Sequence, residues 1–346
     1  MNTPNQIPIQ KLLDALLDES TYFHPRYLYR LSDMDPDDLA RLEKVWNQVP
    51  LWRRQVLMED LQELSENDTL LHFEGMGRIA LKDSDPKVRM LAVRTLGEYE
   101  DRELIPVYLK MVESDSDANV RAMSATALGA FVYLGEIDEL PEKKFHQVEN
   151  TLLRVVKGSD DPLVRRRALE ALSFSSRTEV IPLIEEAFNS IKSDWVVSSL
   201  FAMGRSANEY WNNRVLTMLN HSLPDIQAEA ASAAGELGIK EAVPNLLELL
   251  DDSDIDVRMA AIWSLSQIGG EGVGESLEER LDQAEDENEA DLIESALDNL
   301  AFTEDMGLFS MIDLAKDTRL DVPEYNKHPS NGENLEDDTD TEDTQV

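Results

Sequence analysis

Residues 83–97 read DSDPKVRMLAVRTLG, and most of the remaining chain repeats this stretch with changes. Each copy is marked by a Val-Arg pair that follows acidic and small residues. Further copies occupy 115–129, 159–173 and 252–266. A repeat of nearly fixed length is typical of proteins that stack one structural unit, and it says little about chemistry. The sequence therefore predicts the fold more firmly than the function.

Each copy carries the signals of two helices. Carboxylates or Ser precede the Val and suit a helix N-cap, while small or branched residues after it fill one helical face. The Val or its equivalent recurs at Val88, Val120, Val164, Val196, Ile226, Val257 and Leu292, with a degenerate first copy expected at Val56. A Pro that opens a second helix follows in three copies, at Pro106, Pro182 and Pro244. We therefore expect seven or eight antiparallel helix pairs that bury their apolar faces against one another.

The composition favours helices and excludes several partners. The chain has 346 residues, 42% hydrophobic and only 6% aromatic, and no run of Val, Ile and Thr typical of strands. Its 32 basic and 70 acidic residues give a net charge of -38, which repels nucleic acid and anionic membranes. Cys is absent, so disulfides and thiolate metal sites are excluded. No stretch resembles a signal peptide or a membrane span, which makes a cytoplasmic protein the expectation.

The segment 242–261, AVPNLLELLDDSDIDVRMAA, and the shorter Leu104-Ile105-Pro106 resemble HEAT repeats, in particular the short repeats of phycobilin lyases. The resemblance covers about residues 37 to 302. It implies an all-α fold, an α-solenoid in which antiparallel helix pairs form a right-handed superhelix. The Pro-led helices would form the convex layer, and the Val-Arg helices would line the concave side.

The resemblance also implies a structural ladder of acids and arginines. The ladder maps onto Asp85 with Arg89, Asp117 with Arg121, Asp161 with Arg165, and Asp254 with Arg258. Each acid precedes its arginine by four residues, an order that stabilises a helix by a few tenths of a kcal/mol when the pair is exposed. The pattern lapses at Val197, Gln227 and Ile293, where we expect the ladder to be interrupted.

The copies divide the chain into four parts. Residues 1–36 are expected to form N-terminal capping helices, 37–302 the solenoid, 303–320 a C-terminal capping helix and 321–346 a disordered acidic tail. The interval between Val120 and Val164 is longer than the others and predicts an insertion. We expect this insertion to form a loop over residues 135–144.

The helix faces that point away from the core suggest where a partner binds. Positions two and six after each Val lie opposite the buried face. Up to Trp263 these positions hold one acid, although the chain is rich in acids. The candidate partner-binding residues are Met90, Arg94, Arg166, Met259 and Trp263. An equally good interpretation is that small residues at these positions only permit tight curvature, and both stay open.

No catalytic constellation is visible. The five His lack the spacing of metal ligands, and no Gly-rich phosphate loop is present, so neither metal nor cofactor is expected. The leading hypothesis is a non-enzymatic, monomeric scaffold that binds a basic or amphipathic segment of a partner protein in the concave groove, without nucleic acid binding or membrane insertion. The alternative implied by the resemblance is an enzyme or accessory factor of the bilin lyase type. A spacer within a larger complex is a third possibility.

Overall fold

The computed structural model describes residues 7–97, 99–284 and 286–317, and side chains as far as residue 302. The chain divides into two compact units, Met1–Leu300 and Ala301–Val346, which we treat separately. All regular structure in the described residues is helical. The expected disordered tail, residues 321–346, lies outside the described residues.

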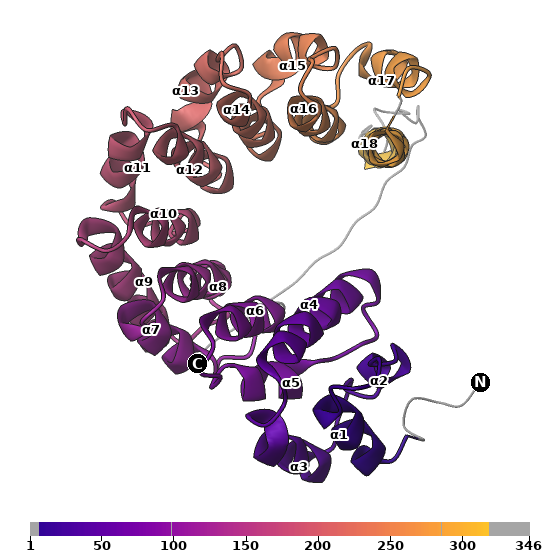
Figure 1. Cartoon of the computed structure of the whole chain (residues 1–346). Coiled ribbons are helices and arrows are strands. Elements are labelled where there is room, and N and C mark those ends of the chain that lie inside the picture. Colours follow the sequence, from indigo (N-terminus) through magenta and orange to yellow (C-terminus); the bar gives the residue numbers. More distant parts are fainter. Residues whose placement is uncertain (1–6, 98, 285, 318–346) are drawn as a thin grey trace, which may run out of the picture. The chain divides into compact units, whose positions relative to one another are not determined.

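The first unit is an α-solenoid, as the sequence predicts. Two layers of helices run side by side along it (Figure 1). The inner layer consists of α4 (Leu51–Asn67), α6 (Pro86–Gly97), α8 (Ala118–Glu136), α10 (Pro162–Ala171), α12 (Ser193–Arg205), α14 (Pro224–Glu236) and α16 (Ile255–Ile268). The outer layer consists of α5 (Glu74–Ala80), α7 (Ile105–Ser114), α9 (Glu142–Lys157), α11 (Val180–Phe188), α13 (Asn212–Met218), α15 (Val243–Leu249) and α17 (Val273–Leu281). Short 3-10 helices, η2 (Glu209–Trp211) and η3 (Lys240–Ala242), precede α13 and α15.

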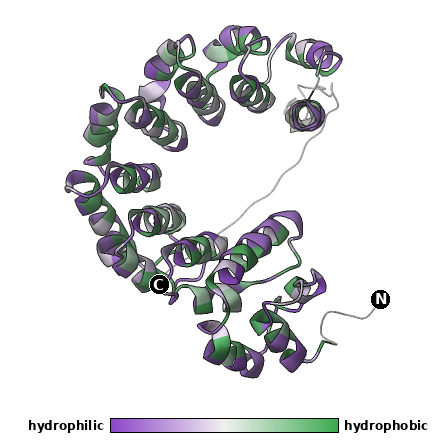
Figure 2. Ribbon diagram, viewed as in Figure 1, coloured by the Kyte–Doolittle hydropathy of each residue, from purple (hydrophilic) through white to green (hydrophobic). Residues whose placement is uncertain are grey.

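The Val-Arg helices form the inner layer and the Pro-led helices the outer layer, which confirms the predicted arrangement of the pairs. The marker residues Val88, Val120, Val164 and Val257 are fully buried. Every helix carries both hydrophobic and hydrophilic residues, as expected of helices with one buried side (Figure 2). The right-handed sense of the superhelix stays a prediction.

The register of the first copy is wrong at Val56. This residue is 46% exposed, whereas the next one, Leu57, is buried. In the last copy Ile293 is likewise buried in place of Leu292. A shift of one residue turns a side chain by about 100° around the helix, so the two terminal copies present a different face than the repeat predicts.

The insertion lengthens two helices instead of forming a ten-residue loop. α8 continues to Glu136 and α9 begins at Glu142, which leaves a short turn between them. Gly135 lets the ring of Phe145 from α9 pack directly against α8, because a Cβ atom at position 135 would lie 2.1 Å from that ring. The prediction of a loop over 135–144 was therefore wrong for half of its length, because only residues 137–141 lie outside the helices.

The N-terminal part consists of α1 (Ile9–Leu17), α2 (Arg26–Tyr29) and α3 (Pro36–Trp46). Arg53 of α4 is buried and donates hydrogen bonds to the carbonyl oxygens of Ala15, Leu16 and Asp18, at 2.5, 3.1 and 2.7 Å. The guanidinium thereby satisfies carbonyl groups that the end of α1 leaves without a helical partner. This contact fastens the first helix to the solenoid.

The last helix, α18, runs from Glu287 to Asp317 without the break expected between a repeat helix and a capping helix. Up to Leu300 it belongs to the first unit, and Ile293, Ala296 and Leu300 join the hydrophobic core. Side chains from 303 onward lie outside the described residues. The role of 303–320 as a cap stays a prediction.

Candidate partner-binding site

The five predicted binding residues all lie on inner-layer helices. Met90 and Arg94 belong to α6, Arg166 to α10, and Met259 and Trp263 to α16. Arg94 is exposed, and the other four are half-buried. They are spread over helices that are not neighbours, so the structure does not bring them together in one pocket.

The two basic residues among the five, Arg94 and Arg166, both form ion pairs. Arg94 Nη2 lies 3.3 Å from Glu66 Oε1 of α4, and Arg166 Nη2 lies 3.2 Å from Asp194 Oδ2 of α12. The acids of both ion pairs lie on neighbouring inner helices. They do not stand two or six positions after a repeat Val, so the sequence analysis did not consider them. Partner binding through the five residues stays a prediction.

Several positions predicted to line the concave side are in fact buried. Ala122, Glu170, Ser198 and Ala202 are at most 8% exposed. The reason is lateral packing, because each inner helix also contacts the inner helices before and after it.

The ladder arginines form ion pairs, but with acids of the next repeat. In Arg89, Arg121 and Arg258, but not in Arg165, Nε and Nη2 donate to the two oxygens of one carboxylate, at 2.6 to 2.9 Å. The pairs are Arg89–Asp115, Arg121–Asp160 and Arg258–Glu289. The expected pairing four residues apart within one helix is therefore wrong.

The acids expected in the ladder accept backbone hydrogen bonds at the helix N-termini. Asp117, Asp161 and Asp254 are N-cap residues whose carboxylates accept hydrogen bonds from backbone N–H groups of the following turn, and Asp85 accepts one from Val88 N. A capping carboxylate is directed at the start of its own helix. The carboxylate is therefore not directed at the arginine of its own helix. The side chains of Arg89, Arg121 and Arg258 extend instead to an acid of the next repeat and link the two repeats by an ion pair.

A groove crosses three successive inner helices, and we call it the inner groove. Its volume is about 440 Å³. It is lined by Thr126, Gly129, Ala130 and Tyr133 of α8, by Arg167, Glu170 and Ala171 of α10 with Phe174 just beyond, and by Phe201 and Arg205 of α12. Gly129 lets α8 and α10 approach closely, since a Cβ there would lie 3.3 Å from Ala171 Cα.

Aromatic side chains form much of the inner groove. The rings of Tyr133 and Phe174 meet edge to face, with centroids 5.2 Å apart. The guanidinium of Arg205 lies 4.8 Å from the ring centre of Phe201 and 5.8 Å from that of Phe174. Tyr133 remains 46% exposed. Stacked rings with exposed faces and edges are suited to holding an apolar side chain of a partner.

Charged groups surround these rings. Arg167 Nη1 donates to Glu170 Oε2 at 2.5 Å, and Ser198 Oγ donates to Glu170 Oε1 at 2.6 Å. Arg205 Nε lies 3.3 Å from Glu236 Oε1 of α14. Most charges at the inner groove are therefore paired and hold the aromatic side chains in place.

Glu229 of α14 does not line the inner groove, but its carboxyl group lies close enough to Glu170, Arg167 and Arg205 of the groove to interact with them electrostatically. It is half-buried, and among the described residues its carboxyl group has no hydrogen bond or ion pair. The pKa of Glu229 is raised to about 7, chiefly by burial and further by the carboxylates of Glu236 and Glu170, while Arg205 and Arg167 lower it. A carboxyl group in this state can accept a cationic group of a partner.

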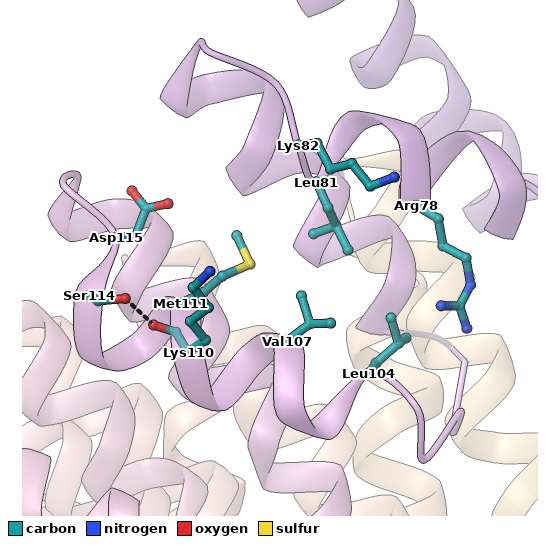
Figure 3. Close-up of a pocket in the computed structure, with 9 residues that line it drawn as sticks. All are labelled: Arg78, Leu81, Lys82, Leu104, Val107, Lys110, Met111, Ser114 and Asp115. Carbon is teal, nitrogen blue, oxygen red and sulfur yellow. Dashed lines mark hydrogen bonds between the residues drawn. The ribbon is translucent and has the colours of Figure 1, made fainter. Parts of the chain in front are cut away.

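The outer layer has a groove of its own, shown in Figure 3. It has a volume of about 550 Å³, and Leu81, Val107 and Met111 form its apolar part. Of its cations, Arg78 pairs with Glu74 and Asp101, and Lys82 pairs with Glu43. The outer groove lacks the aromatic lining of the inner groove.

Sequence reasoning did not find Tyr133, Phe174, Phe201, Arg205 or Glu229. Phe174 follows the end of α10, and Arg205 is the last residue of α12. Neither stands two or six positions after a repeat Val, the positions that the sequence analysis considered. An available signal was that Phe201 stands five positions after Val196, where other copies have aliphatic residues such as Val93 and Leu169.

Comparison with known proteins agrees with the repeat pattern. A family model for HEAT repeats matches residues 75–142 and 213–298, so the chain carries HEAT repeats in these two segments. A comparison with curated proteins gave no match.

Solved structures with a similar arrangement of helices are distant in sequence. The complex of CpcE and CpcF of phycocyanin lyase from Nostoc sp. PCC7120 is 18% identical with a TM-score of 0.46, over 66% of this chain and 94% of that one. YibA of E. coli is 16% identical with a TM-score of 0.43, over 82% of this chain and 99% of that one. Human deoxyhypusine hydroxylase is 18% identical with a TM-score of 0.33, over 77% and 96% of the two chains.

No cluster of three or more His, Asp or Glu side chains among the described residues is placed to hold a metal ion. No helix in the described part of the chain is both long and apolar enough to cross a membrane.

Proposed function

We propose that this protein is a helical-repeat scaffold that binds a segment of a partner protein in the inner groove. The observation that carries the proposal is the groove itself, in which Tyr133, Phe174 and Phe201 are held by three consecutive repeats and left partly open. Binding sites for peptides are concave, largely apolar, and surrounded by a few oriented polar groups. The inner groove has these properties.

The partner segment is amphipathic. An apolar side chain enters between the aromatic residues, and a Lys or Arg beside it reaches Glu229, the carboxyl group that lacks a protein partner among the described residues. The net charge of -38 attracts a basic segment over a longer range. Met259 and Trp263 extend the apolar surface along the inner layer, while Met90, Arg94 and Arg166 offer further contacts.

The proposed function needs no cofactor, metal or second copy of the chain. It is compatible with a monomer in the cytoplasm, and both of these stay predictions. Nothing in the described residues favours the alternative of a bilin lyase or of its accessory factor, which also stays a prediction.

A peptide selection tests the proposal. Random displayed peptides are selected on the full chain, and we expect enrichment of an aromatic or long aliphatic residue next to Lys or Arg. Synthetic copies of the enriched peptides should lose about tenfold or more in affinity for the double variant Tyr133→Ala/Phe201→Ala. The variant Val107→Ser in the outer groove is the matched control and should bind normally. Equal binding to both variants would move the site away from the inner groove.

A further inference from the structure

Three of the four ladder arginines show one geometry. In Arg89, Arg121 and Arg258, Nε and Nη2 hold a carboxylate, and Nη1 donates to a backbone carbonyl of the preceding turn at 2.8 to 2.9 Å. The carboxylate comes from a residue four or five positions before the first buried apolar residue of the next inner helix. These acids are Asp115 before Val120, Asp160 before Val164 and Glu289 before Ile293.

The fourth arginine, Arg165, lacks this partner. The corresponding positions before Val196 are occupied by Ile191 and Lys192. Arg165 Nε donates to Val156 O at 2.8 Å, but within the described residues its Nη1 and Nη2 make no hydrogen bond and no ion pair. Ile191 is fully exposed and does not cover the guanidinium. The place of the ladder carboxylate is therefore open in this repeat.

A cavity of about 380 Å³ lies at this open place, between the end of α9, the start of α10 and the turn from α11 to α12. The ring of Trp195 stacks under Arg165, with 5.2 Å between the guanidinium carbon and the ring centre. Lys157 and Lys192 also line the cavity, against one acid, Glu186. In a chain of net charge -38 this is a local excess of positive charge. The cavity shares no lining residue with the inner groove.

We propose that this cavity is a second binding site, which takes the carboxylate of an Asp or Glu side chain from a partner protein. The carboxylate accepts hydrogen bonds from Nη1 and Nη2 of Arg165, whose Nε is already bound to Val156 O, and an apolar residue beside it packs on Trp195. Planar guanidinium groups bind carboxylates through two parallel hydrogen bonds, and stacking on a Trp ring fixes their orientation. Lys157 and Lys192 attract the acidic segment and disfavour a basic one.

The test uses the full chain and two small peptides, acetyl-Leu-Asp-Leu-amide and its neutral twin acetyl-Leu-Asn-Leu-amide. Binding is followed by NMR through the indole N–H signal of Trp195. Two variants separate the roles: Ile191→Asp supplies the missing ladder carboxylate and occupies Arg165, while Ile191→Asn is its uncharged match. Both variants change a fully exposed side chain, so we expect them to fold as the unmodified protein does. Arg165→Met removes the charge and keeps an apolar stem over Trp195.

We expect the acidic peptide to shift the Trp195 signal and the neutral twin to do so about tenfold more weakly. Ile191→Asp and Arg165→Met should each weaken binding of the acidic peptide by about tenfold or more, and Ile191→Asn by less than about threefold. Equal shifts with both peptides, or unchanged binding to Ile191→Asp, would overturn the proposal. So would inorganic phosphate acting at lower concentration than the acidic peptide, which would assign the site to a phosphoryl group.

Discussion

Replacing Glu229 with Gln should stabilise the protein at neutral and alkaline pH. In the folded state the pKa of this carboxyl group is raised from 4.5 to about 7, chiefly by burial. The folded protein therefore holds a proton that the unfolded chain releases. The contribution of Glu229 to the free energy of unfolding is greatest below pH 4.5, falls as the pH rises from 4.5 to about 7, and remains low above pH 7.

The size of the effect follows from the shift. Each pKa unit corresponds to about 1.4 kcal/mol, so the ionised Glu229 costs the folded state up to about 3 kcal/mol above pH 7. Gln has nearly the same shape and no charge. We expect Glu229→Gln to raise the free energy of unfolding by up to about 3 kcal/mol at pH 8 and by much less at pH 5.

Denaturation by urea, followed by far-UV circular dichroism at both pH values, measures this difference. Glu278→Gln is the matched control, because it removes one negative charge from an exposed position of α17. The control should change stability by less than about 0.5 kcal/mol at either pH. A gain for Glu229→Gln that is equal at pH 5 and pH 8, or absent at pH 8, would refute the assignment of a raised pKa.

Four further substitutions concern the solenoid; urea denaturation measures the effect of the first three, and circular dichroism tests the fourth. Gly235→Ala should destabilise the protein by about 1–3 kcal/mol, because the new Cβ would lie 2.8 Å from Ser264 Cα and force α14 from α16. Gly97→Ala should stabilise it by about 0.5–1 kcal/mol, because among the described residues the new Cβ would meet no atom within 4 Å outside its own helix turn and chain neighbours. Arg121→Met should lower the free energy of unfolding by about 1.5–3 kcal/mol, because it breaks the ion pair with Asp160 of the next repeat. Unchanged stability would show that this ion pair does not stabilise the solenoid. Leu96→Asp should unfold the chain, since this fully buried side chain would become a carboxylate. An unchanged circular dichroism spectrum would contradict the conclusion that Leu96 lies on the buried face of α6.

The repeat pattern was sufficient to predict the layers of the fold. Burial of Val88, Val120, Val164 and Val257 follows from their position before a run of small and branched residues, and this local rule is obeyed wherever the copies are regular. The rule failed at Val56, at one end of the array, where the first copy has a different neighbour.

The candidate site was much less predictable, because it depends on contacts between repeats. A count along one helix places Glu170 and Ala202 on the open side, but the neighbouring inner helices bury both. The same limit applies to the ladder. The spacing of Asp117 and Arg121 allows a pair within the helix, yet the carboxylate caps its own backbone and Arg121 reaches Asp160. Sequence spacing therefore predicted the three arginines that form ion pairs between repeats, together with Arg165, which does not, but it did not predict which acids they contact.

Photo-crosslinking from the inner groove tests the central claim most directly. p-Benzoylphenylalanine is placed at position 201 in one protein and, as a control, at position 107 of the outer groove in another, and both are irradiated in extract of the native cell. The proposed function predicts that position 201 alone becomes linked to a partner, through a peptide in which an apolar residue adjoins Lys or Arg, and that Tyr133→Ala reduces the yield. Crosslinks from position 107 but none from position 201 would contradict it.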